Sequence, residues 1–287
     1  MCATCGCAPA PQPDPGHEHP HASDHGHDDQ HRHDHGHGDQ HRHDHGHGDQ
    51  HRHDHEHDRG HTISLEQRVL AKNDELAAAN RRRLIEGGVR ALNVMSSPGA
   101  GKTTLLERTL SDLTGTVTIS VIEGDQETPL DAERITAAGA KVVQINTGQG
   151  CHLDAAMVRR GLRELDPPDG SVVFIENVGN LVCPALFDLG EAAKVVIASV
   201  TEGEDKPVKY PHMFAAADLV LLNKIDLLPY LRFDVDRWRR GVRRVNPTAA
   251  VLPVSAIAGE GMPDWYAWLR ATRPADPDGH RPPGRAS

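Results

Sequence analysis

The stretch MSSPGAGKTT, residues 95–104, decides the fold class of this 287-residue chain. It stands between an apolar run at 91–95 and a helical pattern at 102–113. A glycine-rich turn that joins a buried strand to a helix is the setting of a phosphate-binding loop. Such a loop turns backbone N–H groups toward phosphate oxygens, and the start of the helix adds partial positive charge. We therefore expect a P-loop domain that binds a nucleotide.

Two side chains of this loop have expected roles. Lys102 should reach the β- and γ-phosphates and serve catalysis, and Thr103 should bind Mg²⁺. Ser96 stands where the pattern G-x-x-x-x-G-K-[ST] has its first glycine, and a small residue is tolerable there. The loop residues predicted to bind the nucleotide are Gly99, Ala100, Gly101, Lys102, Thr103 and Thr104.

Apolar runs rich in β-branched residues alternate with helical patterns through the rest of the domain. The predicted strands are ALNVM (91–95), TVTISVI (116–122), KVVQI (141–145), SVVFI (171–175), KVVIASV (194–200), DLVLLN (218–223) and AAVLPV (249–254). Continuously apolar strands are buried on both faces, which is typical of parallel sheets that have helices on either side. The pattern predicts an α/β P-loop NTPase fold with a mainly parallel, doubly wound sheet.

The folded domain is predicted at 62–273, between disordered tails at 1–61 and 274–287. Its first helix should begin at Ser64, which forms a capping-box pattern with Gln67, and should end at the glycine pair 87–88. The first tail has almost no apolar residue to offset the entropy cost of ordering, and the last residues are rich in proline and glycine.

The acidic charge of the chain is concentrated in its first tail. Residues 1–61 carry 12 Asp and Glu against 4 Lys and Arg, whereas the other residues carry 29 against 27. A nearly neutral body argues against a nucleic-acid-binding surface, and no apolar run approaches the ~20 residues of a membrane span. The N-terminus, MCATCGCAPA, has neither the basic start nor the apolar stretch of a secretory signal. We expect a cytoplasmic protein with reduced thiols.

Two acidic residues follow buried strands near the loop. Glu176 ends the run VVFIE, and Asp125 follows the second predicted strand in EGDQETP, an expected switch segment. Taken alone, an acid at a strand end is more often solvated than bound to a metal. Beside a P-loop, however, both acids are predicted to join Thr103 in binding Mg²⁺ and Lys102 in catalysis.

Two further segments indicate which base is bound. Asn223, Lys224 and Asp226 in NKID resemble the N-K-x-D guanine-specificity motif of GTPases. A carboxylate at Asp226 can accept hydrogen bonds from the N1–H and the exocyclic amine of guanine, and adenine has no matching donors. Ser255 and Ala256 in PVSAIAGEG resemble the short element that contacts the guanine O6. GTP is therefore expected in place of ATP.

The five cysteines of the chain fall into two groups. Cys2, Cys5 and Cys7 form C-x-x-C-x-C, which can wrap three thiolates around one ion; we predict a Ni²⁺ site there whose fourth ligand stays open, and the alternative is unpaired thiols on a free end. The ligands predicted within the domain are Cys151, His152 and Cys183. The segments that carry them leave the carboxyl edge of the sheet, and this ligand set suits Ni²⁺ or Zn²⁺ without choosing between them.

Histidine dominates the first tail, in which DQHRHDHGHG at 29–38 recurs at 39–48 and, as DQHRHDHEHD, at 49–58. Many imidazoles on an extended chain favour exchangeable binding of Ni²⁺, and a solvating spacer is the alternative. The histidines of the repeats predicted to store nickel are His31, His33, His35, His41, His43, His45, His51, His53 and His55.

Taken together, these motifs resemble the hydrogenase nickel-incorporation GTPases, the HypB family. The segments that carry the resemblance are CATCGC, SSPGAGKTT, EGDQETPLDAERI, TGQGCHLDA, FIENVGNLVCPA, TEGEDKPVKYP and NKIDLLP. The resemblance implies a P-loop GTPase of the SIMIBI-like type that forms a homodimer, more tightly with GTP. It also implies delivery of Ni²⁺ to a [NiFe]-hydrogenase large subunit with an accessory nickel protein as partner.

Two alternatives to this function remain at this point. The chain could be a nickel storage or buffering protein, or a urease-type nickel-insertion GTPase that shares the P-loop and guanine motifs. Our hypothesis for the mechanism is that GTP hydrolysis gates metal transfer, because Glu176 and Cys183 lie on one segment, seven residues apart.

Overall fold

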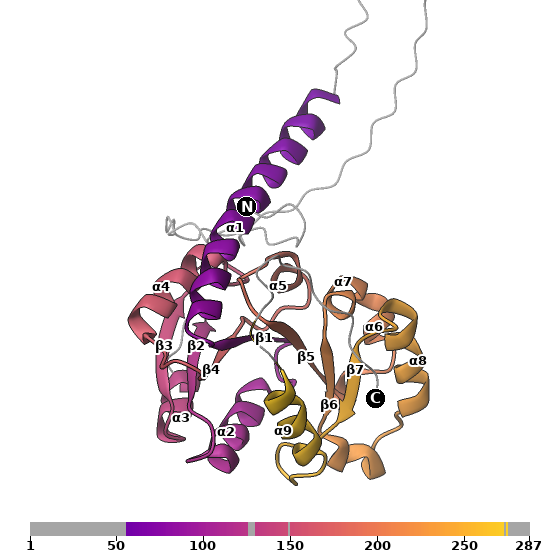
Figure 1. Ribbon diagram of the computed structural model, residues 1–287. Coiled ribbons are helices and arrows are strands. Elements are labelled where there is room, and N and C mark those ends of the chain that lie inside the picture. Colours follow the sequence, from indigo (N-terminus) through magenta and orange to yellow (C-terminus); the bar gives the residue numbers. More distant parts are fainter. Residues whose placement is uncertain (1–55, 126–129, 149, 273, 275–287) are drawn as a thin grey trace, which may run out of the picture. The chain divides into compact units, whose positions relative to one another are not determined.

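Seven strands form one parallel sheet in the described part of the chain, in the order β3-β2-β4-β1-β5-β6-β7 (Figure 1). The computed structural model describes residues 56–125, 130–148, 150–272 and 274. The strands are β1 (Arg90–Ser96), β2 (Ile119–Asp125), β3 (Lys141–Asn146), β4 (Val172–Glu176), β5 (Ala193–Ser199), β6 (Leu219–Asn223) and β7 (Ala250–Pro253). All six neighbouring pairs are parallel, so the predicted doubly wound α/β class is confirmed.

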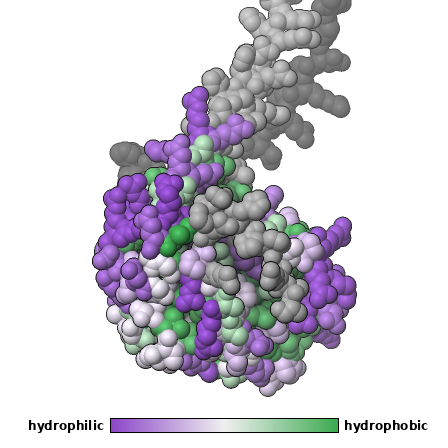
Figure 2. Space-filling model, viewed as in Figure 1, coloured by the Kyte–Doolittle hydropathy of each residue, from purple (hydrophilic) through white to green (hydrophobic). Residues whose placement is uncertain are grey.

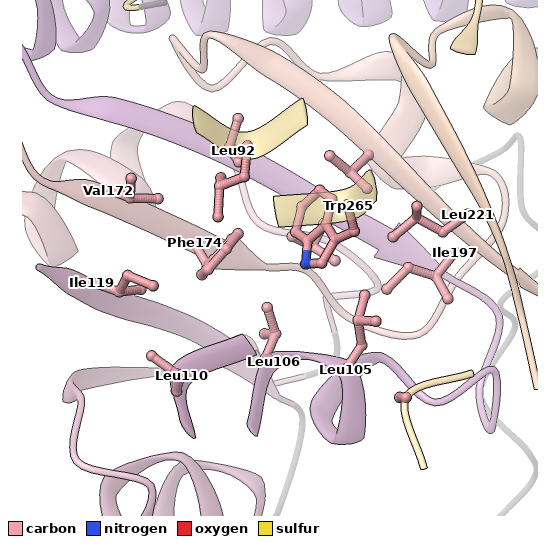
Figure 3. Close-up of a cluster of buried hydrophobic side chains, with 14 of the residues drawn as sticks. Leu92, Leu105, Leu106, Leu110, Ile119, Val172, Phe174, Ile197, Leu221 and Trp265 are labelled. Atoms are coloured by element: carbon pink, nitrogen blue, oxygen red, sulfur yellow. The ribbon is translucent and has the colours of Figure 1, made fainter. Parts of the chain in front are cut away.

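Helices cover both faces of the sheet because side chains alternate along every strand. Leu92 and Val94 of β1 pack on one face, in a cluster with Trp265 (Figure 3). The helices that contribute to this cluster are α2 (Lys102–Leu113), α3 (Leu130–Ala137) and α9 (Met262–Ala271). Ala91 and Met95 of the same strand pack on the opposite face. That face is covered by α1 (Glu56–Glu86), α4 (Ala155–Leu165), α7 (Pro211–Ala215) and α8 (Val235–Val245).

Four short elements complete the described fold. They are α5 (Cys183–Leu186), η1 (Val200–Glu202), α6 (Lys206–Lys209) and η2 (Ile225–Tyr230). α6 packs against α8, whose outer face carries five arginines and gives the hydrophilic surface over this helix in Figure 2.

The prediction for the first helix is right at its end and wrong at its start. α1 begins at Glu56, so Ser64 lies inside the helix and is not its N-cap. The segment 56–63 contains no proline, so helical backbone can extend past the predicted start. The end of α1 follows the glycine signal: Gly88 has a φ of 60°, and the N–H of Val89 donates to the Leu84 carbonyl at 2.8 Å. This left-handed glycine turn is a common helix terminus.

All seven predicted strands are present, but the second is displaced along the sequence. β2 begins at Ile119 because the N–H groups of Thr116 and Val117 are bonded to the Leu113 carbonyl at the end of α2. The strand then continues to Asp125, so this acid is the last residue of β2. The prediction that Asp125 lies after the strand is therefore wrong.

The chain divides between His61 and Thr62 into two units, and everything described below concerns the second. The nickel sites predicted at Cys2, Cys5 and Cys7 and on the histidine repeats lie outside the described residues, as does almost all of the predicted C-terminal tail. Among the helices within the described ranges, none has the length and apolar character needed to cross a bilayer.

Candidate functional site

The predicted phosphate loop lies at the carboxyl end of β1 and leads into α2. Gly99 and Gly101 have φ angles of 75° and 94°, which L side chains rarely adopt. A Cβ at Gly101 would also lie 2.6 Å from Nδ2 of Asn223, so glycine is required there on two counts. Thr103 is 7% exposed, at the start of the helix where the backbone dipole is positive.

Glu176 stands at the centre of the site and joins the loop to β4. Its Oε1 lies 2.7 Å from the Lys102 Nζ and accepts a hydrogen bond of 2.8 Å from the Thr103 hydroxyl. The residue is 1% exposed, and its Oε2 has no hydrogen-bond partner among the described residues. A buried, unsatisfied carboxylate oxygen beside a hydroxyl group fits Mg²⁺, which takes oxygen ligands. Thr103 and Glu176 could therefore hold this ion. The third predicted ligand, Asp125, ends β2, the strand that pairs with β4.

Glu123, a second carboxyl group beside Glu176, was not among the predicted site residues. The two residues are register partners on the adjacent strands β2 and β4, and Glu123 is 2% exposed with an unsatisfied Oε2. Burial, and then repulsion from Glu176, Asp125 and Asp131, raise the pKa of Glu123 to about 8, against an ordinary value of 4.5. The available signal was an acid, Glu123, directly after the apolar end of the second predicted strand. The strand assigned to 116–122 ended one residue before Glu123.

Glu123→Gln should stabilise the nucleotide-free protein in a pH-dependent way. The folded state keeps the Glu123 proton up to about pH 8, whereas the unfolded chain loses it near 4.5. Unfolding therefore releases a proton between these values, and wild-type stability falls as the pH rises through this window. Each unit of pKa difference corresponds to about 1.4 kcal/mol, so the variant should gain up to a few kcal/mol above pH 8 and nothing below pH 4.5.

Urea unfolding with EDTA between pH 4.5 and 9 measures this effect. Glu164→Gln, at an exposed position on α4, is the control and should give the same small difference at every pH. A Glu123→Gln gain that does not change with pH would contradict the assignment of the raised pKa.

The two predicted base-binding segments meet at the phosphate loop. Asn223, the last residue of β6, donates through Nδ2 to the Ala100 carbonyl at 3.0 Å and accepts through Oδ1 from the Ala256 N–H at 3.2 Å. Lys224 Nζ donates to the Gly99 carbonyl at 2.6 Å. One amide thus connects the ends of β1, β6 and β7.

Asp226 and Ser255 make a second connection between these segments. The Ser255 hydroxyl donates to Oδ1 of Asp226 at 2.5 Å and accepts from the Ala258 N–H at 3.0 Å. The carboxylate is thereby oriented from one side. Its other oxygen has further acceptor capacity for a base that presents N–H donors, as guanine does.

The three metal ligands predicted in the domain lie together at the same edge of the sheet. The Cys151 Sγ is 2.9 Å from the Cys183 Sγ and 3.7 Å from the His152 Nδ1, and the three ligand atoms lie within 4.8 Å of one another. Two thiols and an imidazole at this spacing form a ligand set for a borderline divalent metal ion.

Local structure holds each ligand in place. The His152 ring is stacked on Phe187 with centroids 4.0 Å apart, and burial lowers its pKa, which favours the neutral imidazole that binds metals. Asp154 caps α4 by accepting from the Met157 N–H at 2.7 Å. Asn180 accepts from the Cys183 N–H at 3.3 Å, at the start of α5.

The segment between Glu176 and Cys183 also contacts the phosphate loop. A Cβ at Gly179 would lie 3.2 Å from the backbone nitrogen of Pro98, so the two backbones pass too closely for a larger residue to fit without displacement. The predicted metal ligand Cys183 is therefore attached to a segment that touches the predicted phosphate loop at two places, through Glu176 and through Gly179.

Comparison with known proteins gives a consistent result. A family model described as the CobW/HypB/UreG nucleotide-binding domain matches residues 90–253. The hydrogenase maturation factor HypB of Rhizobium leguminosarum bv. viciae is similar, with 60% identity over 210 residues, which cover 73% of this chain and 70% of the relative.

Two solved structures are similar over nearly their whole length. HypB from Archaeoglobus fulgidus has a TM-score of 0.66 and 41% identity, covering 70% of this chain and 98% of that one. HypB from Helicobacter pylori, solved in complex with nickel, has a TM-score of 0.65 and 39% identity, covering 69% of this chain and 94% of that one.

Proposed function

This chain belongs to the CobW/HypB/UreG family, and within it to the hydrogenase maturation factors HypB, and from that premise we propose that it is a GTP-hydrolysing nickel chaperone. It binds Ni²⁺ at Cys151, His152 and Cys183 and delivers the ion during maturation of a [NiFe]-hydrogenase. The GTP assignment is supported by the oriented carboxylate of Asp226, which suits the N–H donors of guanine.

One observation carries this proposal. Glu176, which is bonded to both Lys102 and Thr103 of the phosphate loop, lies seven residues before Cys183 on one short segment. A P-loop protein without a transport role has no need for thiols attached to its phosphate-sensing segment. The arrangement instead suits a protein in which the nucleotide decides whether the metal is held.

Lys102 has two competing partners in this scheme. Its ammonium lies 2.7 Å from Oε1 of Glu176, and the phosphate oxygens of bound GTP, which carry more negative charge, would compete for it. The buried Glu176 carboxylate then requires another positive partner. Mg²⁺, held by Thr103, Asp125 and Glu176, would neutralise charge on the β- and γ-phosphates. When the γ-phosphate leaves, part of the negative charge that holds Lys102 at the phosphates is lost, which favours its pairing with Glu176.

The nickel ion is the cargo, and its affinity is set by the positions of its three ligands. Cys151 and His152 lie on the loop before α4, whereas Cys183 lies on the segment that begins at Glu176. A small displacement of one segment relative to the other separates Cys183 from the other two ligands and loosens the ion. Exchange of the Lys102 partner at Glu176 supplies such a displacement.

The test of this proposal is nickel affinity in two nucleotide states. We use a variant, here named the tail-silent chain, that lacks residues 17–61 and carries Cys2→Ser, Cys5→Ser and Cys7→Ser. Its Ni²⁺ affinity should differ at least about fivefold between GDP and a non-hydrolysable GTP analogue. Equal affinities and equal release rates in the two states would contradict gating, because a ligand without differential affinity shifts no equilibrium.

The partners and the first tail complete the proposed function. The protein acts in the cytoplasm as a homodimer favoured by GTP, together with an accessory nickel protein and the [NiFe]-hydrogenase large subunit. The tail stores nickel on its histidines, and Cys2, Cys5 and Cys7 bind a further ion. If delivery resides in the body, deleting residues 17–61 should leave hydrogenase activity intact in nickel-replete cells, and loss of activity there would show that the tail delivers.

A further inference from the structure

We propose that Asn177 is the positioning residue through which the nucleotide site and the metal site are coupled. This inference rests on the proposed function and adds the physical connection that the proposal requires. Asn177 follows Glu176 directly and is 0% exposed, and its side chain belongs neither to the phosphate loop nor to the three metal ligands.

The side chains of Glu176 and Asn177, at the end of β4, point to opposite faces of the sheet. Successive residues of a strand point to opposite faces of the sheet. Phe174 lies in the cluster on the α2 face and Ile175 in the cluster on the α4 face. Glu176 lies two residues after Phe174 and therefore points to the same α2 face, where it accepts a hydrogen bond from Thr103 of α2. Asn177 extends the pairing of β4 through its N–H to the Val94 carbonyl at 3.0 Å, so its side chain turns to the α4 face.

On the α4 face, the Asn177 amide connects the loop before α4 to β1. Its Oδ1 accepts from the Leu153 N–H at 3.0 Å, and Leu153 directly follows the ligands Cys151 and His152. Its Nδ2 donates to Oδ1 of Asn93 at 3.2 Å, which ties the amide to β1, the strand that leads into the phosphate loop. A shift of the backbone at Glu176 must therefore either carry Leu153 with it or break a buried hydrogen bond.

Leu153 also packs against β2. A Cβ at Gly124 would lie 2.6 Å from the Leu153 Cγ, so the leucine side chain is pressed against the backbone of this glycine. Gly124 stands between Glu123 and Asp125, the two acids that β2 contributes to the nucleotide side. The loop that carries Cys151 and His152 is thus held from both sides by residues adjacent to the acids of the nucleotide site.

These contacts predict how the coupling operates. Asn177 moves the loop of Cys151 and His152, and the backbone from Glu176 onward moves Cys183. The two groups of ligands respond to the same carboxylate through different connections, so their separation depends on the nucleotide. Without the Asn177 amide, the loop before α4 is no longer held against β4, so it can follow Cys183 through the shared metal ion when the segment after Glu176 moves. The separation of the two groups of ligands then stops depending on the nucleotide.

The experiment measures coupling from the nucleotide side, because linkage is reciprocal. In the full-length protein, we measure the dissociation constants of a fluorescent non-hydrolysable GTP analogue and of fluorescent GDP, with Mg²⁺, either with saturating Ni²⁺ or with a chelator. The quantity compared is the factor by which Ni²⁺ changes the ratio of the two constants. In wild type, Ni²⁺ should change this ratio at least about fivefold. In Cys183→Ala it should not change the ratio, because this variant reports any nickel effect that comes from outside the three-ligand site.

Asn177→Ala should reduce the change to less than about twofold while each dissociation constant without nickel stays within about threefold of wild type. The matched control is Asn246→Ala. Asn246 is also a buried amide with several backbone hydrogen bonds, among them 3.0 Å to the Phe214 carbonyl, and lies on the far part of the fold after α8. Asn246→Ala should lower the free energy of unfolding about as much as Asn177→Ala, and Ni²⁺ should still change the ratio of its two dissociation constants as in wild type.

A conservative variant protects the test against misfolding. Asn177→Asp keeps the acceptor for the Leu153 N–H but replaces the donor to Asn93 with a carboxyl oxygen at a position that is 0% exposed, so its stability is first compared with that of Asn177→Ala by urea unfolding. The folded variant should retain most of the nickel effect. A full effect in Asn177→Ala, or an equal loss in Asn246→Ala, would overturn the role of Asn177. Absence of any effect in wild type, or its persistence in Cys183→Ala, would overturn the proposed gating itself.

Discussion

Lys102→Ala is expected to lower kcat/KM for GTP hydrolysis by about 10²–10³-fold, the effect of removing one preorganised charge from a phosphoryl-transfer site. The substitution also removes the cation that lies 2.7 Å from Glu176, whose side chain is 2% exposed. A buried charge that loses its partner costs about 3–5 kcal/mol of stability. The single variant should therefore be both inactive and less stable, as measured by phosphate release and by urea unfolding.

A double variant separates these two effects. Lys102→Ala combined with Glu176→Gln removes the unpaired charge and keeps an oxygen that can accept from the Thr103 hydroxyl. Stability should return to within about 1 kcal/mol of wild type, while hydrolysis stays at the level of the single variant. Hydrolysis that recovers together with stability would show that Lys102 acts through the fold and not on the phosphates.

Cys183→Ala is expected to weaken Ni²⁺ binding to the tail-silent chain by at least about 100-fold, because it removes one of three protein ligands. Cys183 is 1% exposed, yet the loss of one sulfur atom leaves only a small cavity, so the fold and nucleotide binding should persist. The thiolate-to-nickel absorption band should fall in intensity together with the affinity.

The matched control for this variant lies on the same short helix. Leu186→Ala truncates a side chain that is 42% exposed in α5 and contributes no ligand. It should keep both the nickel affinity and the absorption band. An unchanged affinity in Cys183→Ala would remove this residue from the site and leave Cys151 and His152 as the remaining predicted ligands.

Local signals were sufficient for the fold and for the residues of the phosphate loop. Apolar runs that end in turns set the seven strands, and the pattern from Pro98 to Thr103 required a strand before it and a helix after it. Glu123 escaped this reasoning because its importance lies in its register partner, Glu176, which is 53 residues away in the sequence. Only the pairing of β2 with β4 brings the two carboxyl groups together and raises the pKa of one of them.

By itself, the sequence determined the fold class, the phosphate loop, and the kinds of residue that could bind a base and a metal, because each depends on neighbours within a few positions. The tertiary structure alone decided which of them meet. The parallel sheet brings the ends of β1, β2, β4 and β6 to one edge, and the alternation of side chains sends Glu176 toward Thr103 of the phosphate loop and Asn177 toward the loop of Cys151 and His152. Hydrogen bonds between residues far apart in the chain, such as that from Leu153 to Asn177, have no local signal, because their partners are chosen by packing.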